Sequence, residues 1–165
     1  MAQITLGGNP VHTVGDLPAP GEKAPAFELV KADFSTISSE DLAGSRVVLN
    51  IFPSLDTGVC ATSVRTFNER AASLADTTVV CVSADLPTAA GRFCAAEGIE
   101  DVVTGSTFRS TFPDDFGVRM TDGKMQGLNA RAVVVIDRDG TVLHSELVPE
   151  IAQEPDYDAA TAALG

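Results

Sequence analysis

The stretch that decides the fold is RVVLNIFPSLDTGVCATSV, residues 46–64. Its first part, residues 46–52, is an apolar run typical of a central β-strand that is covered on both faces. Pro53 ends that run, and a short loop follows. Beyond the loop, apolar residues recur at steps of three and four, which predicts one buried face of a helix. The stretch therefore predicts a buried strand, a tight loop and a helix that begins near residue 57.

Two further apolar runs predict strands of the same kind, at residues 78–84 (TVVCVSA) and 132–137 (AVVVID). Between them, residues 87–97 are expected to form a helix, with a proline near its start and Gly98 as its stop. The order strand, helix, strand, helix, strand favours parallel strands joined by right-handed crossovers at the centre of a sheet.

Shorter elements are predicted at both ends of the chain. Residues 3–6 and 11–14 alternate around Gly7-Gly8-Asn9-Pro10, which indicates a β-hairpin. The remaining predictions are strands at residues 26–31, 102–104 and 141–148, helical turns at 111–116 and from Ser38 or Ser39 to Gly44, and a last helix at 157–164 capped by Asp156.

These elements predict an α/β protein with a central mixed sheet flanked by helices on both faces. We expect a single domain over residues 1–165, with residues 1–17 as an N-terminal hairpin extension. The arrangement is compatible with a thioredoxin-like fold, although periodicity alone does not separate that fold from other three-layer α/β folds. A chain of this length can bury a substantial core without metals or disulfides.

The charge balance bears on partners and location. Asp and Glu number 23 against 11 Lys and Arg, giving a net charge of −12, which argues against nucleic acid and anionic membranes as partners. No apolar run is long enough to span a membrane, and MAQITLGGNP lacks the basic and apolar regions of a secretory signal. We therefore expect a cytoplasmic protein. Three irregularly spaced cysteines do not resemble a secreted disulfide framework.

Cys60 stands out among those cysteines because it lies in the first turn of the predicted helix. Free backbone N–H groups and the positive end of the helix dipole favour a thiolate there. Thr57 is expected to cap the helix, which would bring its hydroxyl close to the Cys60 sulfur. The alternative is a small buried cysteine that only begins a helix. A position outside the carboxyl end of a central strand favours a functional site.

Three other residues have plain structural interpretations. Cys81 lies within a predicted strand, and we interpret it as a core residue. Cys94 follows Phe93 on the second helix, where a small apolar side chain is an ordinary occupant. Arg131 precedes a strand, and by pattern alone it is a solvated strand-end charge.

At this point the chain resembles a known family, the peroxiredoxins, and most closely their thiol peroxidase branch of atypical two-cysteine enzymes. The motif Pro53-x-x-x-Thr57-x-x-Cys60 is similar to the active-site motif of that family. The resemblance spans essentially the whole chain through further blocks: GNPV at residues 8–11, residues 48–64, SADLPTAAGRFCAAEG at 83–98, LNARAVVVID at 128–137 and EPDY at 154–157.

The resemblance implies a role for each matching residue. Cys60 is the expected peroxidatic cysteine and Cys94 the resolving one, while Thr57 would be the hydroxyl partner of peroxide and thiolate. Pro53 would shield the pocket, and Arg131 would be the active-site arginine. The implied enzyme is a homodimeric antioxidant peroxidase without metal or organic cofactor. It would reduce hydrogen peroxide and alkyl hydroperoxides through a Cys60 sulfenic acid and an intramolecular Cys60–Cys94 disulfide, which thioredoxin reopens.

Three rival functions compete with this one. A thioredoxin-type oxidoreductase would need a second thiol at position 63, where the chain has Ser63. A zinc module would need short paired spacings, whereas Cys60, Cys81 and Cys94 are 21 and 13 residues apart. A redox sensor or signal relay would use the same Cys60 chemistry without scavenging as its main role, and the sequence does not distinguish it from a peroxidase.

Overall fold

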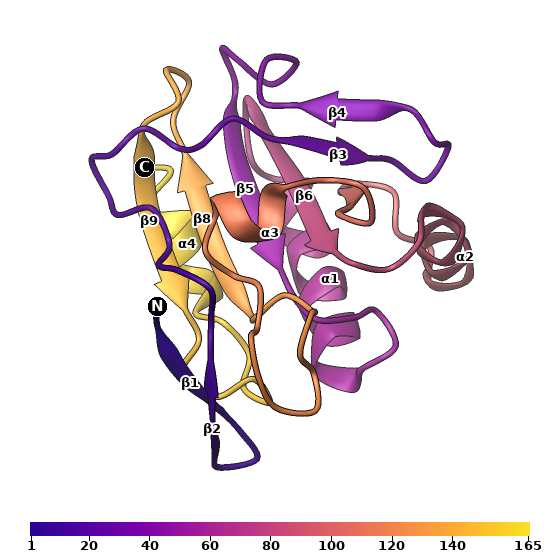
Figure 1. Cartoon of the computed structure of the whole chain (residues 1–165). Coiled ribbons are helices and arrows are strands. Elements are labelled where there is room, and N and C mark those ends of the chain that lie inside the picture. The colour runs from indigo at the N-terminus through magenta and orange to yellow at the C-terminus, as the bar shows by residue number, and fades with distance from the viewer.

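The computed structural model describes residues 1–165 as a two-stranded hairpin beside a seven-stranded mixed sheet (Figure 1). The sheet has the order β4-β3-β7-β6-β5-β8-β9. Its central strands β5, β6 and β7 are parallel, and its other neighbours are antiparallel. The strands are β1 (Gln3–Leu6), β2 (Asn9–His12), β3 (Glu28–Val30), β4 (Thr36–Ser38), β5 (Arg46–Ile51), β6 (Thr77–Ser83), β7 (Val103–Ser106), β8 (Ala132–Ile136) and β9 (Val142–Leu147).

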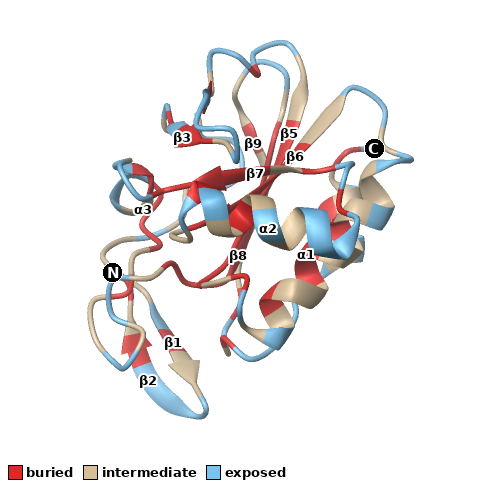
Figure 2. Cartoon of the chain, turned by 90° about the vertical axis from the view of Figure 1, so that its right-hand side faces the viewer, coloured by how far each residue is buried: buried red, intermediate tan, exposed pale blue.

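Helices cover both faces of the sheet, as predicted. One face carries α1 (Gly58–Ala71), α2 (Pro87–Glu97) and α4 (Tyr157–Ala162), which share a cluster of 15 buried residues with β5, β6 and β8. The other face carries α3 (Phe112–Asp115) and the chain before β3, over a second cluster of 16 buried residues. Figure 2 shows the central strands buried and the outward surfaces of α1 and α2 more exposed. None of the helices combines the length and hydrophobicity needed to cross a membrane.

Two predictions at the amino-terminal side were wrong in detail. The hairpin turn is Gly7-Gly8 alone, with φ of 59° and 83°, and the second strand begins at Asn9 instead of residue 11. Two consecutive residues at positive φ complete a two-residue turn, so Asn9 and Pro10 are free to pair with β1. A strand, β4, also occupies residues where only the start of a helical turn was expected; non-helical turns follow it as far as Gly44.

The topology brings the two cysteine-bearing helices to one edge of the sheet. Helix α1 follows β5 and α2 follows β6, and these strands are parallel neighbours, so both helices begin outside the same carboxyl edge. The antiparallel strand β8 begins at that edge too, because Ala132 pairs with Ile51, the last residue of β5. Arg131 is therefore placed beside the loop that leads to Cys60.

Candidate active site

Cys60 lies in the first turn of α1 with its side chain completely buried. The helix begins at Gly58, and the N–H groups of residues 58–60 donate to no backbone or side-chain acceptor of the protein. Such unpaired donors at a helix N-terminus carry partial positive charge and favour an anion nearby. The fold therefore surrounds the Cys60 sulfur with groups that suit a thiolate.

Arg131 is the direct partner of Cys60. Its Nη2 lies 3.2 Å from the Cys60 Sγ, and only 1% of the arginine is exposed. No carboxylate pairs with this guanidinium, and its Nη1 has no hydrogen-bond partner in the protein. Burying an unpaired cation is costly, so an anion at Cys60 is the compensating charge that the site offers. The pattern that suggested a solvated strand-end charge was misleading, because β8 starts inside the molecule.

Thr57 occupies the N-cap position of α1, but its side chain makes no capping hydrogen bond. Its hydroxyl instead donates to the carbonyl oxygen of Ser54, 3.1 Å away, which closes the loop before the helix. The expected capping geometry is therefore wrong, and no hydrogen bond joins the Thr57 hydroxyl to Cys60 in this state. Pro53 is buried two residues after the end of β5, at the entrance to the same loop.

The other two cysteines have different surroundings. Cys81 lies in β6 and is buried, and desolvation raises the pKa of its thiol to about 12. That burial agrees with a core residue. Cys94 lies on α2, half-buried against the same apolar cluster that contains Cys60, and burial raises the pKa of its thiol as well. All three cysteines are free thiols.

Asp85 is a residue of the site that sequence reasoning missed. Its carboxylate accepts hydrogen bonds from the Ser54 hydroxyl (2.9 Å), the Leu55 N–H (2.8 Å) and the Ser83 hydroxyl (2.7 Å). It lies just before α2, so it ties the loop that leads to Cys60 to the start of the helix that carries Cys94. No sequence signal distinguishes it from an ordinary loop aspartate.

Two buried polar side chains, Ser63 and Asn50, support the helix backbone behind Cys60. The Ser63 hydroxyl donates to the Cys60 carbonyl oxygen at 2.8 Å and accepts from the Asn50 side chain at 3.2 Å. Asn50 and Ser63 are fully buried, so they fix the first turn of α1 against β5. The same Asn50 amide approaches the Cys81 sulfur at 3.7 Å.

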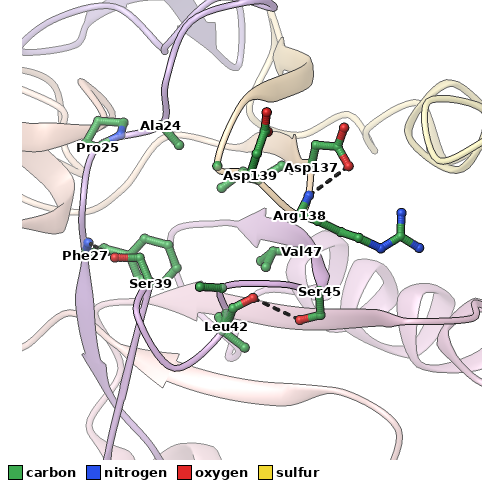
Figure 3. A pocket seen from close by; sticks show the side chains of 13 residues that line it. Ala24, Pro25, Phe27, Ser39, Leu42, Ser45, Val47, Asp137, Arg138 and Asp139 are labelled. Carbon is green, nitrogen blue, oxygen red and sulfur yellow. Dashed lines mark hydrogen bonds between the residues drawn. The ribbon is translucent and has the colours of Figure 1, made fainter.

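A concavity of about 210 Å³ lies between the loop after β5 and α2, and its lining includes Leu55, Asp85 and Phe93. A larger cavity, of about 340 Å³, lies at the opposite end of the sheet (Figure 3). Its walls include Phe27, Leu42 and Val47, with Asp137 and Arg138 beside them. Because Val47 is at the amino end of β5, this second cavity is remote from the Cys60 loop.

Comparisons with known proteins show what the whole chain is similar to. Residues 19–161 match the family model described as Redoxin. Over 165 residues the chain is 62% identical to a thiol peroxidase of Mycobacterium tuberculosis, covering 100% of this chain and 99% of the relative. It is 55% identical to a thiol peroxidase of Corynebacterium glutamicum, with 99% of each covered.

Solved structures show the same architecture. A peroxiredoxin-like protein from Aquifex aeolicus is 37% identical and superposes with a TM-score of 0.94, covering 99% of this chain and 96% of that one. A thiol peroxidase from Chromobacterium violaceum, at 21% identity, has the same fold with a TM-score of 0.91 over 99% of this chain and 96% of that one.

Proposed function

The chain belongs to the thiol peroxidases of the redoxin family, and we propose that it reduces hydrogen peroxide and alkyl hydroperoxides at Cys60. It is a thiol-dependent peroxidase by family membership. The observation that best supports Cys60 as the reacting residue is the 3.2 Å contact between its sulfur and the buried Arg131 guanidinium. No other cysteine of the chain has a cation within hydrogen-bond distance.

In the first step, the Cys60 thiolate attacks one peroxide oxygen, a sulfur–oxygen bond forms and the O–O bond breaks. The sulfur loses two electrons and becomes a sulfenic acid, while the leaving oxygen takes up a proton and departs as water or an alcohol. Negative charge grows on that oxygen in the transition state. Two kinds of donor can stabilise this charge: the free Nη1 of Arg131 and the unpaired N–H groups of the first turn of α1. Thr57 lies beside these donors.

In the second step, the Cys94 sulfur attacks the sulfenic acid sulfur, a disulfide forms and water leaves. A disulfide requires the two Cα atoms to be within about 7 Å of each other. Cys60 and Cys94 lie on separate helices that pack into one apolar cluster, and we expect part of α1 or α2 to unwind in this step. Exposure of Cys94 in that opened state also removes the desolvation that raises its pKa.

The cycle closes when an external dithiol reduces the disulfide by thiol–disulfide exchange. Thioredoxin is the proposed reductant, and a cytoplasmic homodimer is the proposed working form. Both are expectations for the family, and the first experiment tests the reductant directly.

The experiment adds one equivalent of hydrogen peroxide to the reduced protein, then counts free thiols and maps disulfides by mass spectrometry. The chain has no Trp and a single Tyr, so mass mapping serves better here than fluorescence. We expect two thiols to disappear, a Cys60–Cys94 bridge to form, and thioredoxin with its reductase to restore both thiols. Cys60→Ser should abolish the reaction, and Cys94→Ser should stop at the sulfenic acid.

Two results would contradict the proposal. A reduced Cys60 after peroxide treatment would remove it as the nucleophile, and a sulfenic acid without a bridge to Cys94 would remove the resolving assignment. Steady turnover with thioredoxin distinguishes a scavenging peroxidase from a redox sensor that uses the same cysteine.

A further inference from the structure

We propose that the N-terminal β1–β2 hairpin positions Arg131 against Cys60, and that it does so through the backbone N–H and carbonyl of Ile151. Thr5 is the positioning residue of this relay. The inference rests on the proposed function of Cys60, and it gives the hairpin a catalytic purpose. The hairpin lies outside the main sheet, near the sheet edge at which β5 ends and β8 begins (Figure 1).

The first link joins Arg131 to the segment before α4. The Arg131 Nε donates to the Ile151 carbonyl oxygen at 2.8 Å, while Nη2 of the same guanidinium faces the Cys60 sulfur. A guanidinium is planar, so a hydrogen bond that fixes Nε also fixes the plane in which both Nη atoms point. The Ile151 carbonyl is the only protein acceptor bonded to this side chain, apart from Cys60 itself. The direction of Nη2 therefore depends on where Ile151 is held.

The second link joins Ile151 to the hairpin through the backbone of Thr5. The Ile151 N–H donates to the Thr5 carbonyl at 2.9 Å, and the Thr5 N–H donates to the Pro149 carbonyl at 2.8 Å. Within the hairpin Thr5 is opposite Pro10, which has no N–H to offer. Both backbone groups of Thr5 thus serve residues 149–151, and β1 meets that segment at a single parallel bridge between Thr5 and Glu150.

The third link holds the pairing in register. The Glu150 carboxylate accepts from the Thr5 hydroxyl at 3.1 Å and from the Gly8 N–H at 2.9 Å, and its other oxygen accepts from the Ala152 N–H at 2.8 Å. The Ile151 side chain is buried in a separate apolar cluster with Ile4, Val11, Met120 and Ala130. Ala130 directly precedes Arg131. The hairpin therefore packs against the residue before the arginine and also against Ile151, which bonds the arginine side chain.

These links give the backbone of Ile151 a partner on each side: its N–H donates to the hairpin, and its carbonyl accepts from Arg131. Displacing the hairpin would free the backbone of Ile151 to move and would deprive Nε of its fixed acceptor. Misplacement of a reacting group by about 1 Å can lower a rate by about a hundredfold. The relay therefore predicts that a change at Thr5 acts on Cys60 although the two residues do not touch.

The test compares Thr5→Pro with Thr5→Val in the full chain. Proline removes the N–H that bonds Pro149 and places its ring against that carbonyl, yet it breaks no bond between β1 and β2, since Thr5 makes none. Valine keeps both backbone bonds and loses only the hydroxyl. For Thr5→Pro we expect the rate of Cys60 oxidation by hydrogen peroxide to fall by about tenfold to a hundredfold. For Thr5→Val we expect a change of about twofold or less.

Two further readouts separate positioning from a general loss of structure. The first readout is the thiolate absorbance of the reduced protein as a function of pH. This absorbance curve should be displaced to higher pH in Thr5→Pro relative to the wild type. That curve tests the relay even if peroxide turns out not to react at Cys60, so failure of the relay is distinguishable from failure of the proposed function. In an Arg131→Lys background, which lacks the Nε–Ile151 bond, Thr5→Pro should have no further effect on either readout.

Glu150→Ala covers the case in which Thr5→Pro does not fold, because Glu150 is a partly exposed side chain whose loss weakens only the docking. It should shift both readouts in the same direction as Thr5→Pro and by less, while Glu22→Ala, a remote charge-matched control, should leave them unchanged. The relay is overturned if a folded Thr5→Pro or Glu150→Ala keeps the wild-type rate and thiolate curve. It is equally overturned if Thr5→Pro has its full effect when Arg131 is already lysine.

Discussion

Cys60 and Cys94 share one apolar cluster, but the structure treats them in opposite ways. The sulfur of Cys60 is fully buried, faces a guanidinium at 3.2 Å and lies at a helix start fixed by Ser63 and Asn50. Cys94 is half-buried in the middle of α2, with no charged or polar partner for its sulfur. The surroundings of Cys60 are preorganised for reaction, whereas those of Cys94 are not.

The difference matches what the two chemical steps require. Attack on a peroxide gains from donors that are already in place when charge develops, so rigidity accelerates it. Formation of a disulfide between two helices needs the cysteines to approach, so rigidity opposes it. The predictions below test whether this division between a fixed and a movable cysteine holds, beginning with the change expected to have the largest effect.

Arg131→Gln removes the cation from the fixed site and should have the largest effect. Loss of a preorganised donor typically costs about 10²- to 10³-fold in rate, and we expect that loss in the oxidation of Cys60 by hydrogen peroxide. The measurement is rapid quenching followed by mass analysis of Cys60. Formation of the disulfide from a Cys60 sulfenic acid, once made, should change much less. An equal loss in both steps would indicate that Arg131 supports the fold rather than the peroxide reaction.

The pH dependence of the second step should reveal the movable cysteine. Burial raises the pKa of Cys94 above its ordinary value of 9.0, so at neutral pH this thiol is protonated in the closed structure. Below that pKa the thiolate fraction increases about tenfold for each unit of pH, and only the thiolate attacks. We therefore expect disulfide formation to accelerate as pH rises from neutrality toward 9, measured by quenching after a single peroxide addition. A rate that does not change over this range would contradict attack by Cys94.

Asp85→Asn tests the tie between the two sites. Asp85 bonds the loop before Cys60 and lies at the entrance to α2, and an amide replaces its charge-assisted bonds with weaker ones. If these hydrogen bonds are weakened by about 1.4 kcal/mol, separation of the Cys60 loop from the start of α2 becomes about tenfold more favourable. Disulfide formation should accelerate accordingly, with a lower thermal midpoint. A slower disulfide step would mean that Asp85 guides the approach of the cysteines instead of restraining it.

Much of this division could be predicted from the sequence, because the residues that create it lie in local patterns. The run at residues 46–64 is one continuous strand, loop and helix, so the position of Cys60 followed from periodicity and from the stop at Pro53. The boundaries of α2, including its end at Gly98 with φ of 66°, followed from proline and glycine signals.

The remaining features depend on long-range contacts that no local pattern encodes. By pattern alone Arg131 was a solvated charge, and only the family resemblance indicated its role; the pairing of Ala132 with Ile51 is what buries it. Asp85 acts through hydrogen bonds to a loop 30 residues away, and Ile151 through its backbone carbonyl, which carries no sequence signature. The Thr57 capping bond failed because a nearby carbonyl of its own loop, that of Ser54, captures the hydroxyl.

Gly91→Ala should have the smallest effect of these changes. It tests the movable cysteine in the opposite direction to Asp85→Asn, because it should make opening less favourable. Gly91 is inside α2, three residues before Cys94, and it does not adopt a positive φ. A Cβ placed there would contact the Ala32 Cβ at 3.5 Å, an ordinary van der Waals distance, so alanine fits. Alanine stabilises a helix interior by about 1 kcal/mol relative to glycine, which makes unwinding of α2 about fivefold less favourable.

If α2 must unwind for Cys94 to reach Cys60, Gly91→Ala will slow disulfide formation by about that factor and leave peroxide oxidation of Cys60 unchanged. Ala90→Gly, one position earlier in the same helix, is the reciprocal change and should accelerate the step, although it also removes a buried methyl group. The quantity to measure is the ratio of disulfide to over-oxidised Cys60 at increasing peroxide, because slower resolution leaves the sulfenic acid exposed to a second oxidation. Equal ratios in the wild type and Gly91→Ala would show that α2 stays closed, and would move the required opening to the first turn of α1.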